Sequence, residues 1–93
     1  MPAYWIANVT VTDEAGYAEY AKRAGEIIPA HGGEFLARGG RYRQMEGREH
    51  PRNVLARFPS FEAAVGCYES PEYQEALKYA LPASERDIVI LEG

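Results

Sequence analysis

Hydrophobic positions along the chain alternate with polar ones in some segments and recur at helical spacing in others. Segments rich in β-branched and aromatic residues predict four strands, near residues 3–11, 34–46, 52–58 and 86–92. In the first of these, both sets of alternating residues are apolar, which indicates a strand that is covered on both of its faces.

Two helices are expected between these strands. The first spans residues 13–30, with Thr12 or Asp13 as its cap, and its apolar positions recur every three or four residues. The second begins near Ser60 and restarts at Ser70 and Pro71, where serine can cap a new turn and proline is tolerated. Pro82 ends it.

The stretch "HGGEFLARGG" joins the first helix to the second strand. His31 complements the negative end of the helix dipole, and Gly32 and Gly33 can take the left-handed conformation that ends a helix. Gly39 and Gly40 predict a turn or bulge within an edge ribbon. The stretch is therefore expected to be a helix end that leads into a strand.

The order of elements is βαββαβ, which predicts a single α+β domain over residues 1–93 with a ferredoxin-like fold. Right-handed crossovers place both helices on one face of a four-stranded antiparallel sheet. On the first strand, Tyr4 and Ile6 then point away from Trp5, Ala7 and Val9. Because one apolar set would be bare in a monomer, we expect a homodimer joined through the sheet faces that lie away from the helices.

Composition narrows the class of protein. The net charge of −4 argues against a nucleic-acid partner. The chain lacks an apolar run near the roughly 20 residues of a membrane span, and its start lacks the features of a signal peptide. Cys67 is the only cysteine, which favours a reducing, cytoplasmic setting. On its predicted helix, this cysteine is better explained as a small buried residue than as a nucleophile.

Six of the ten positive residues are arginines between Arg38 and Arg57. One interpretation is a solvated hairpin whose arginines pair with acidic helices. The other is an anion-binding surface, because arginine holds carboxylates and phosphates through two hydrogen bonds.

His31 is the candidate catalytic residue, as a general base that works near neutral pH. The alternative is a histidine that only hydrogen-bonds to the carbonyls at the helix end. His50 is expected to be exposed in a polar loop. Two distant histidines and one cysteine provide no metal-ligand spacing, and the glycine pairs match neither a P-loop nor a dinucleotide site, so neither metal nor cofactor is expected.

Seven tyrosines in 93 residues is a high number. They could simply fill the core, but a phenol combines an apolar ring with a hydroxyl and suits a pocket for an organic ligand. Trp5 is expected beside this pocket. The candidate substrate-binding residues are Tyr4, Asn8, Tyr20, Arg38, Tyr68 and Tyr73.

Several motifs together resemble the family named domain of unknown function 1330. They are "HGGEFLARGG", "EG", "FPSFEAA", "SPEYQEAL" and the final "ILEG", spread over nearly the whole chain. The resemblance implies a dimeric α/β barrel, in which ferredoxin-like subunits pair through their sheets and each holds a cavity. The wider group includes cofactor-free monooxygenases of the antibiotic-biosynthesis type, haem-degrading enzymes and dye-decolourising relatives. Family members often carry an arginine after "EYQ", whereas the nearby cations here are Lys78 and Arg86.

Two functional hypotheses follow. The first is a cofactor-independent enzyme that acts on a small organic molecule, anionic or aromatic, with His31 as base and an arginine that holds the negative group. The second is a non-catalytic dimer that binds a small ligand.

Overall fold

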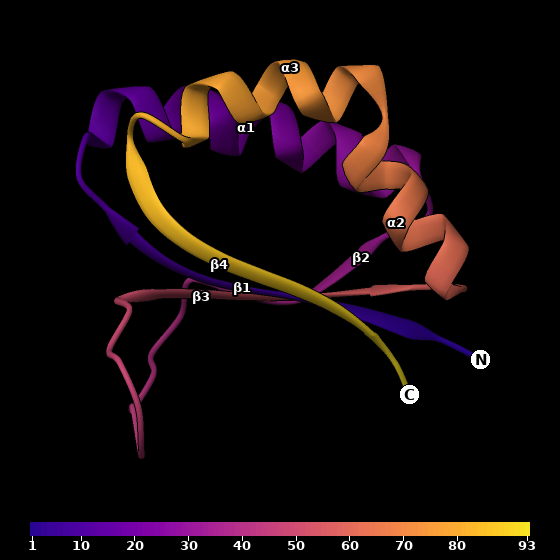
Figure 1. The fold of residues 1–93 in the computed structure, drawn as a ribbon, viewed down its shortest axis with the longest axis horizontal. Coiled ribbons are helices and arrows are strands. Elements are labelled where there is room, and N and C mark those ends of the chain that lie inside the picture. Colours follow the sequence, from indigo (N-terminus) through magenta and orange to yellow (C-terminus); the bar gives the residue numbers. More distant parts are fainter.

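A four-stranded antiparallel sheet is covered on one face by three helices (Figure 1). The computed structural model describes residues 1–93. In chain order the elements are β1 (Ala3–Val11), α1 (Glu14–Ala30), β2 (Glu34–Arg38), β3 (Arg52–Phe58), α2 (Phe61–Glu69), α3 (Pro71–Ala80) and β4 (Ser84–Glu92). The strand order is β2-β3-β1-β4. The predicted βαββαβ plan is confirmed, with the second helix divided into α2 and α3.

Side-chain caps begin each helix. Asp13 accepts a hydrogen bond from the backbone of Gly16 at the start of α1, and Ser60 accepts one from Ala63 at the start of α2. Ser70 accepts from Tyr73 and so starts α3 directly after α2. These oxygens satisfy N–H groups that have no partner within a helix.

The face of the sheet beneath the helices forms the core. Side chains on β1 alternate strictly, so Trp5, Ala7 and Val9 are buried there. From the helices, the residues that complete this core are Tyr17, Tyr20, Ala24, Ile28, Ala64, Cys67, Tyr73, Ala76, Leu77 and Ala80.

The opposite face of the sheet is partly bare and apolar. Ile6 pairs with Leu55 on one side and Val89 on the other, which makes an apolar row across three strands. Val89 is 54% exposed and Leu91 is 43% exposed. We call this surface, made by Tyr4, Ile6, Leu55, Val89 and Leu91, the outer face.

The second strand is shorter than predicted. The expectation of a strand over residues 34–46 is wrong, because β2 ends at Arg38. Gly39 takes a left-handed φ of 72°, and its N–H makes the last ladder-like bond, to Asn53. The chain then leaves the sheet on the side away from the helices (Figure 1), and residues 39–49 are all exposed. The predicted bulge falls between Phe35 and Ala37 instead.

Candidate functional site

Three polar side chains meet beneath the helices. Tyr20 comes from α1, Tyr73 from α3 and Arg86 from β4, and the two tyrosine oxygens lie 2.7 Å apart. One terminal nitrogen of Arg86, Nη2, donates to Tyr20 Oη at 2.9 Å and to Tyr73 Oη at 3.1 Å. The guanidinium carbon also lies 4.5 Å from the centre of the Tyr20 ring. We call these three residues the Arg–Tyr cluster.

Arg86 has donor groups left over. Its Nε and Nη1 are buried without a hydrogen-bond partner in the protein, and the ion pairs of the chain join other side chains. A buried donor that lacks a partner costs roughly 1–3 kcal/mol, and more when the group is charged. Within the chain, the charge of Arg86 therefore has no carboxylate partner, and two of its nitrogens have no acceptor.

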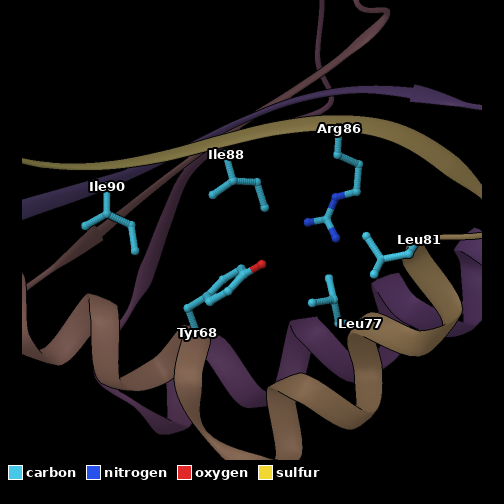
Figure 2. Close-up of a pocket in the computed structure, with 6 residues that line it drawn as sticks. All are labelled: Tyr68, Leu77, Leu81, Arg86, Ile88 and Ile90. Carbon is cyan, nitrogen blue, oxygen red and sulfur yellow. The ribbon is translucent and has the colours of Figure 1, made fainter.

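A cavity of about 270 Å³ lies beside this guanidinium, between β4 and the helices. Figure 2 shows Arg86 reaching from β4 toward the helices, with Ile88 and Ile90 on the same strand and facing the same space. Tyr68 approaches from α2, with its hydroxyl turned toward the middle of the pocket. Besides these residues, the lining contains Leu77 and Leu81.

Burial and the cluster fix the charges in the site. Burial raises the pKa of Tyr73 far above its usual range, with the neighbouring Tyr20 adding to the rise, so this phenol stays protonated. For Arg86, burial lowers the pKa, but the hydroxyls of Tyr20 and Tyr73 outweigh it and raise the pKa overall. The cluster thus presents one positive charge beside the neutral hydroxyl of Tyr73.

This arrangement can stabilise negative charge. A carboxylate, or an enolate or phenolate oxygen, could accept hydrogen bonds from the free guanidinium nitrogens, while an apolar body would contact the leucines and isoleucines. Fixed donors of this kind favour charge that develops on oxygen during a reaction. The lining contains neither a carboxylate nor an imidazole.

Several predicted residues lie together. The rings of Tyr68 and Tyr73 are 5.1 Å apart, and the rings of Trp5 and Tyr73 are also 5.1 Å apart, in an edge-to-face contact. Tyr20 joins them through its hydrogen bond with Tyr73. Arg38 lies farther along the sheet, where it donates to the Ala21 carbonyl and stacks on the ring of Phe35.

Tyr4 and Asn8 do not share this pocket. Both lie on the side of β1 that points away from the helices, because strand alternation separates them from Trp5. Asn8 donates to the side chain of Asn53 at 2.7 Å, across the strand pair. The expectation that these two residues line the cavity with the tyrosines is therefore wrong.

His31 lies where the first helix meets the second strand, as its C-terminal cap. Its Nε2 is 3.8 Å from Glu72 Oε1, and its side chain is 30% exposed. It does not line the cavity beside Arg86, and its role as a base stays a prediction.

His50 is buried, so the expectation of an exposed loop histidine is wrong. It is 5% exposed, and its Nδ1 lies 2.9 Å from the Thr10 hydroxyl. Its Nε2 is 3.3 Å from an Asp87 oxygen. The loop that carries it folds back against β1 and β4, and Asn53 donates a hydrogen bond to the His50 carbonyl.

Arg86 was missed as a site residue. Of the two cations that follow the "EYQ" segment, Lys78 pairs with Glu75 on the surface, whereas Arg86 enters the pocket. The signal was present in the last strand, where Arg86 occupies the same alternating set as the apolar Ile88 and Ile90. A charged residue in the inward set of a strand indicates a buried polar site.

Groups of three or more side chains able to hold a metal ion do not occur in the structure. None of the helices combines the length and the apolar character needed to cross a membrane.

The fold and the pocket define a ferredoxin-like α+β protein with an arginine in a largely apolar cavity. The family model described as domain of unknown function (DUF1330) matches residues 2–93, and the chain belongs to this family. Comparison with curated proteins gives no match.

Solved structures share the fold at low sequence identity. A protein of unknown function from Rhodopseudomonas palustris is 20% identical, with a TM-score of 0.79 over 99% of this chain and 82% of that one. A dimeric ferredoxin-like protein of unknown function from Jannaschia sp. CCS1 is 17% identical, with a TM-score of 0.76 over 100% of both chains. The cofactor-independent oxygenase SnoaB from Streptomyces nogalater is 12% identical, with a TM-score of 0.72 over 99% of this chain and 92% of that one.

Proposed function

We propose that this protein is a homodimer in which each subunit binds a small organic anion in the cavity beside Arg86. The observation that carries the proposal is the guanidinium itself, because two of its buried nitrogens lack a protein partner and Arg86 lines a largely apolar pocket. A ligand with a carboxylate or an acidic hydroxyl would supply the missing charge, and its apolar part would contact the leucines and isoleucines. The single buried cysteine favours a cytoplasmic location.

Hexanoate is a suitable probe, because it joins one carboxylate to an apolar chain. We expect calorimetry to detect its binding to the wild-type protein and a loss of roughly tenfold or more in affinity for Arg86→Gln. Arg57→Gln is the matched control, since Arg57 is exposed and points to the outer face. Equal affinity in Arg86→Gln and wild type would refute the proposal.

The enzymatic form of the proposal is a cofactor-independent oxidation. Its support is the likeness in fold to SnoaB, which is described as a cofactor-independent oxygenase, together with donors placed to stabilise an oxyanion. With hydroquinone as the probe, the substrate would lose two electrons and two protons, and oxygen would take them up as hydrogen peroxide.

Oxygen uptake separates the enzyme from the non-catalytic binder. Uptake that falls in both Arg86→Gln and His31→Ala supports an enzyme with His31 as base. Uptake that depends on Arg86 alone removes His31 from the mechanism. Hexanoate binding without oxygen uptake supports the non-catalytic small-ligand dimer.

A further inference from the structure

Residues 39–49 form an arm that stands away from the body of the subunit. The arm leaves the sheet on the side opposite the helices (Figure 1), and every residue in it is exposed. Its side-chain hydrogen bonds are internal, because the Tyr42 hydroxyl donates to the Glu49 carboxylate and the Gln44 amide donates to the Glu46 carbonyl. The arm is therefore shaped by its own contacts, while its side chains form no hydrogen bond or ion pair with the rest of the chain.

The arm carries three arginines and two exposed apolar side chains. Arg41, Arg43 and Arg48 take part in none of the ion pairs of the chain. Met45 is 78% exposed and Tyr42 is 37% exposed. Such a surface, with cations around an apolar tip, suits an apolar partner surface that is bordered by carboxylates.

The start of β4 supplies carboxylates of this kind. Glu85 and Asp87 belong to the same alternating set of β4 as Val89 and Leu91, so they border the outer face. Glu85 is exposed and takes part in no ion pair. The side chain of Asp87 is 73% exposed, and its one ion-pair contact is with His50. Both carboxylates can therefore accept a further cation.

The arm and these carboxylates lie at the same end of the sheet but on opposite edges. The N–H of Gly39 at the base of the arm donates to Asn53, which pairs with Asn8, and Asn8 pairs with Asp87. The strand order β2-β3-β1-β4 puts three strand spacings, about 14 Å, between β2 and β4. At this end β4 rises toward the helices, whereas the arm descends on the other side of the sheet (Figure 1).

Two-fold symmetry brings the arm and the carboxylates together between subunits. An axis that runs between two outer faces, parallel to the strands, places β2 of one subunit opposite β4 of the other and keeps the same ends together. An arm that projects beyond the outer face then extends along the partner's β4, and the contact occurs twice. An axis across the strands would instead place the arm near the partner's Glu34 and Arg57, whose charges offset one another.

We propose that the arm grips a second copy of this chain, with Arg41 and Arg43 paired to Glu85 and Asp87 of the partner subunit. This inference rests on the homodimer of the proposed function and adds the orientation of the two subunits. Apolar contact between the outer faces is not directional, whereas complementary charges at the edge fix which way the faces meet.

Charge reversal on either side tests the contact. The arm variant is Arg41→Glu with Arg43→Glu, and the strand variant is Glu85→Arg with Asp87→Asn, in which asparagine can still accept from His50. Both changes bring like charges together in the dimer, so we expect each to raise the dissociation constant of the dimer roughly tenfold or more, as measured by sedimentation. The control is Lys22→Glu with Lys78→Glu, which has the net charge of the arm variant but lies on the helices, and it should dimerise like the wild type.

A mixture of the two variants gives the sharper result. In the mixed dimer, the reversed arm meets the reversed strand and the native arm meets the native strand, so both contacts are attractive. In each homodimer, both contacts are repulsive. By native mass spectrometry of an equimolar mixture, we expect mixed dimers to outnumber the two homodimers roughly tenfold or more.

The outcomes separate the inference from the proposed dimer. A wild-type protein that stays monomeric removes the dimer and the inference together. A wild-type dimer with either variant paired as tightly, and folded by circular dichroism, overturns the arm contact and leaves the dimer intact. The same conclusion holds if the control variant weakens the dimer equally, or if the mixture pairs at random.

Discussion

Burial controls the chemistry of Cys67. The side chain is fully buried in α2, and burial raises the pKa of its thiol to about 11, with Glu72 adding to the rise. Only the thiolate is a good nucleophile, and at pH 8 about one thiol in a thousand would be ionised at this pKa. The Cys67 side chain therefore packs in the core as a neutral thiol and is not a nucleophile.

We predict that iodoacetamide leaves Cys67 unmodified at pH 8 in the folded protein and alkylates it rapidly in urea, as measured by mass spectrometry. The raised pKa also determines how the stability of the protein changes with pH. An unfolded thiol ionises near pH 9 and the folded one near 11, so this contribution to the free energy of unfolding is present below pH 9 and lost as the pH rises toward 11. Cys67→Ala should lack this part of the pH dependence. Alkylation of the native protein at the rate of a free thiol would contradict the prediction.

Single site residues were predictable only in part. The tyrosines were found because a phenol at a core position of a helix is a local signal. The partnership of Tyr20 with Arg86 was not found, since the two are 66 positions apart and meet only through the crossover of the chain. His50 was misjudged for the same reason, because its burial depends on strands that lie far away in the sequence.

At the scale of elements, Ser70 joins α2 to α3. Its hydroxyl donates to the Cys67 carbonyl at 2.7 Å and accepts from the Tyr73 backbone N–H at 3.2 Å. One side chain thus forms hydrogen bonds with a carbonyl at the end of one helix and with an N–H at the start of the next. Since Tyr73 belongs to the Arg–Tyr cluster, this cap also holds the backbone of a site residue in place.

We expect Ser70→Ala to lower the free energy of unfolding by about 1–2 kcal/mol, because it leaves the buried Tyr73 N–H without its partner and removes one of the two hydrogen bonds to the Cys67 carbonyl. Ser60→Ala is the control, since Ser60 caps α2 through one hydrogen bond and is less buried. It should cost about 1 kcal/mol or less. Urea unfolding measures both, and a Ser70→Ala variant as stable as the wild type would rule out this role.

Elements with local signals were predicted well from the sequence. The caps and the helical spacing are encoded within a few residues, so the helices and their starts were predictable. The continuation of the second strand beyond Arg38 was not, because residues 40–46 have strand-like composition but no partner strand. Whether a segment joins a sheet depends on pairing with distant residues, which composition alone does not report.

At the scale of the whole molecule, the two faces of the sheet carry different kinds of side chain. The inner face carries the arginines and the pocket, while the outer face carries the row of Leu55, Ile6 and Val89. Contiguous apolar surface of this kind marks an interface in a protein of this size. A dimer joined through the outer faces would therefore leave the pocket in each subunit free for the ligand.

The proposed dimer predicts that light scattering gives about twice the 10.4 kDa of one chain, and that Val89→Glu gives a monomer. Val89 is 54% exposed in a single subunit, so a glutamate there is solvated in the monomer and the fold should persist by circular dichroism. In the dimer, the same carboxylate would be buried without a partner, which costs several kcal/mol. Phe61→Glu adds an equal charge on the helical side, where Phe61 is 39% exposed, and should remain dimeric. A wild-type mass near 10.4 kDa at micromolar concentration, or a Val89→Glu variant that still pairs, would show that the outer face is not the interface.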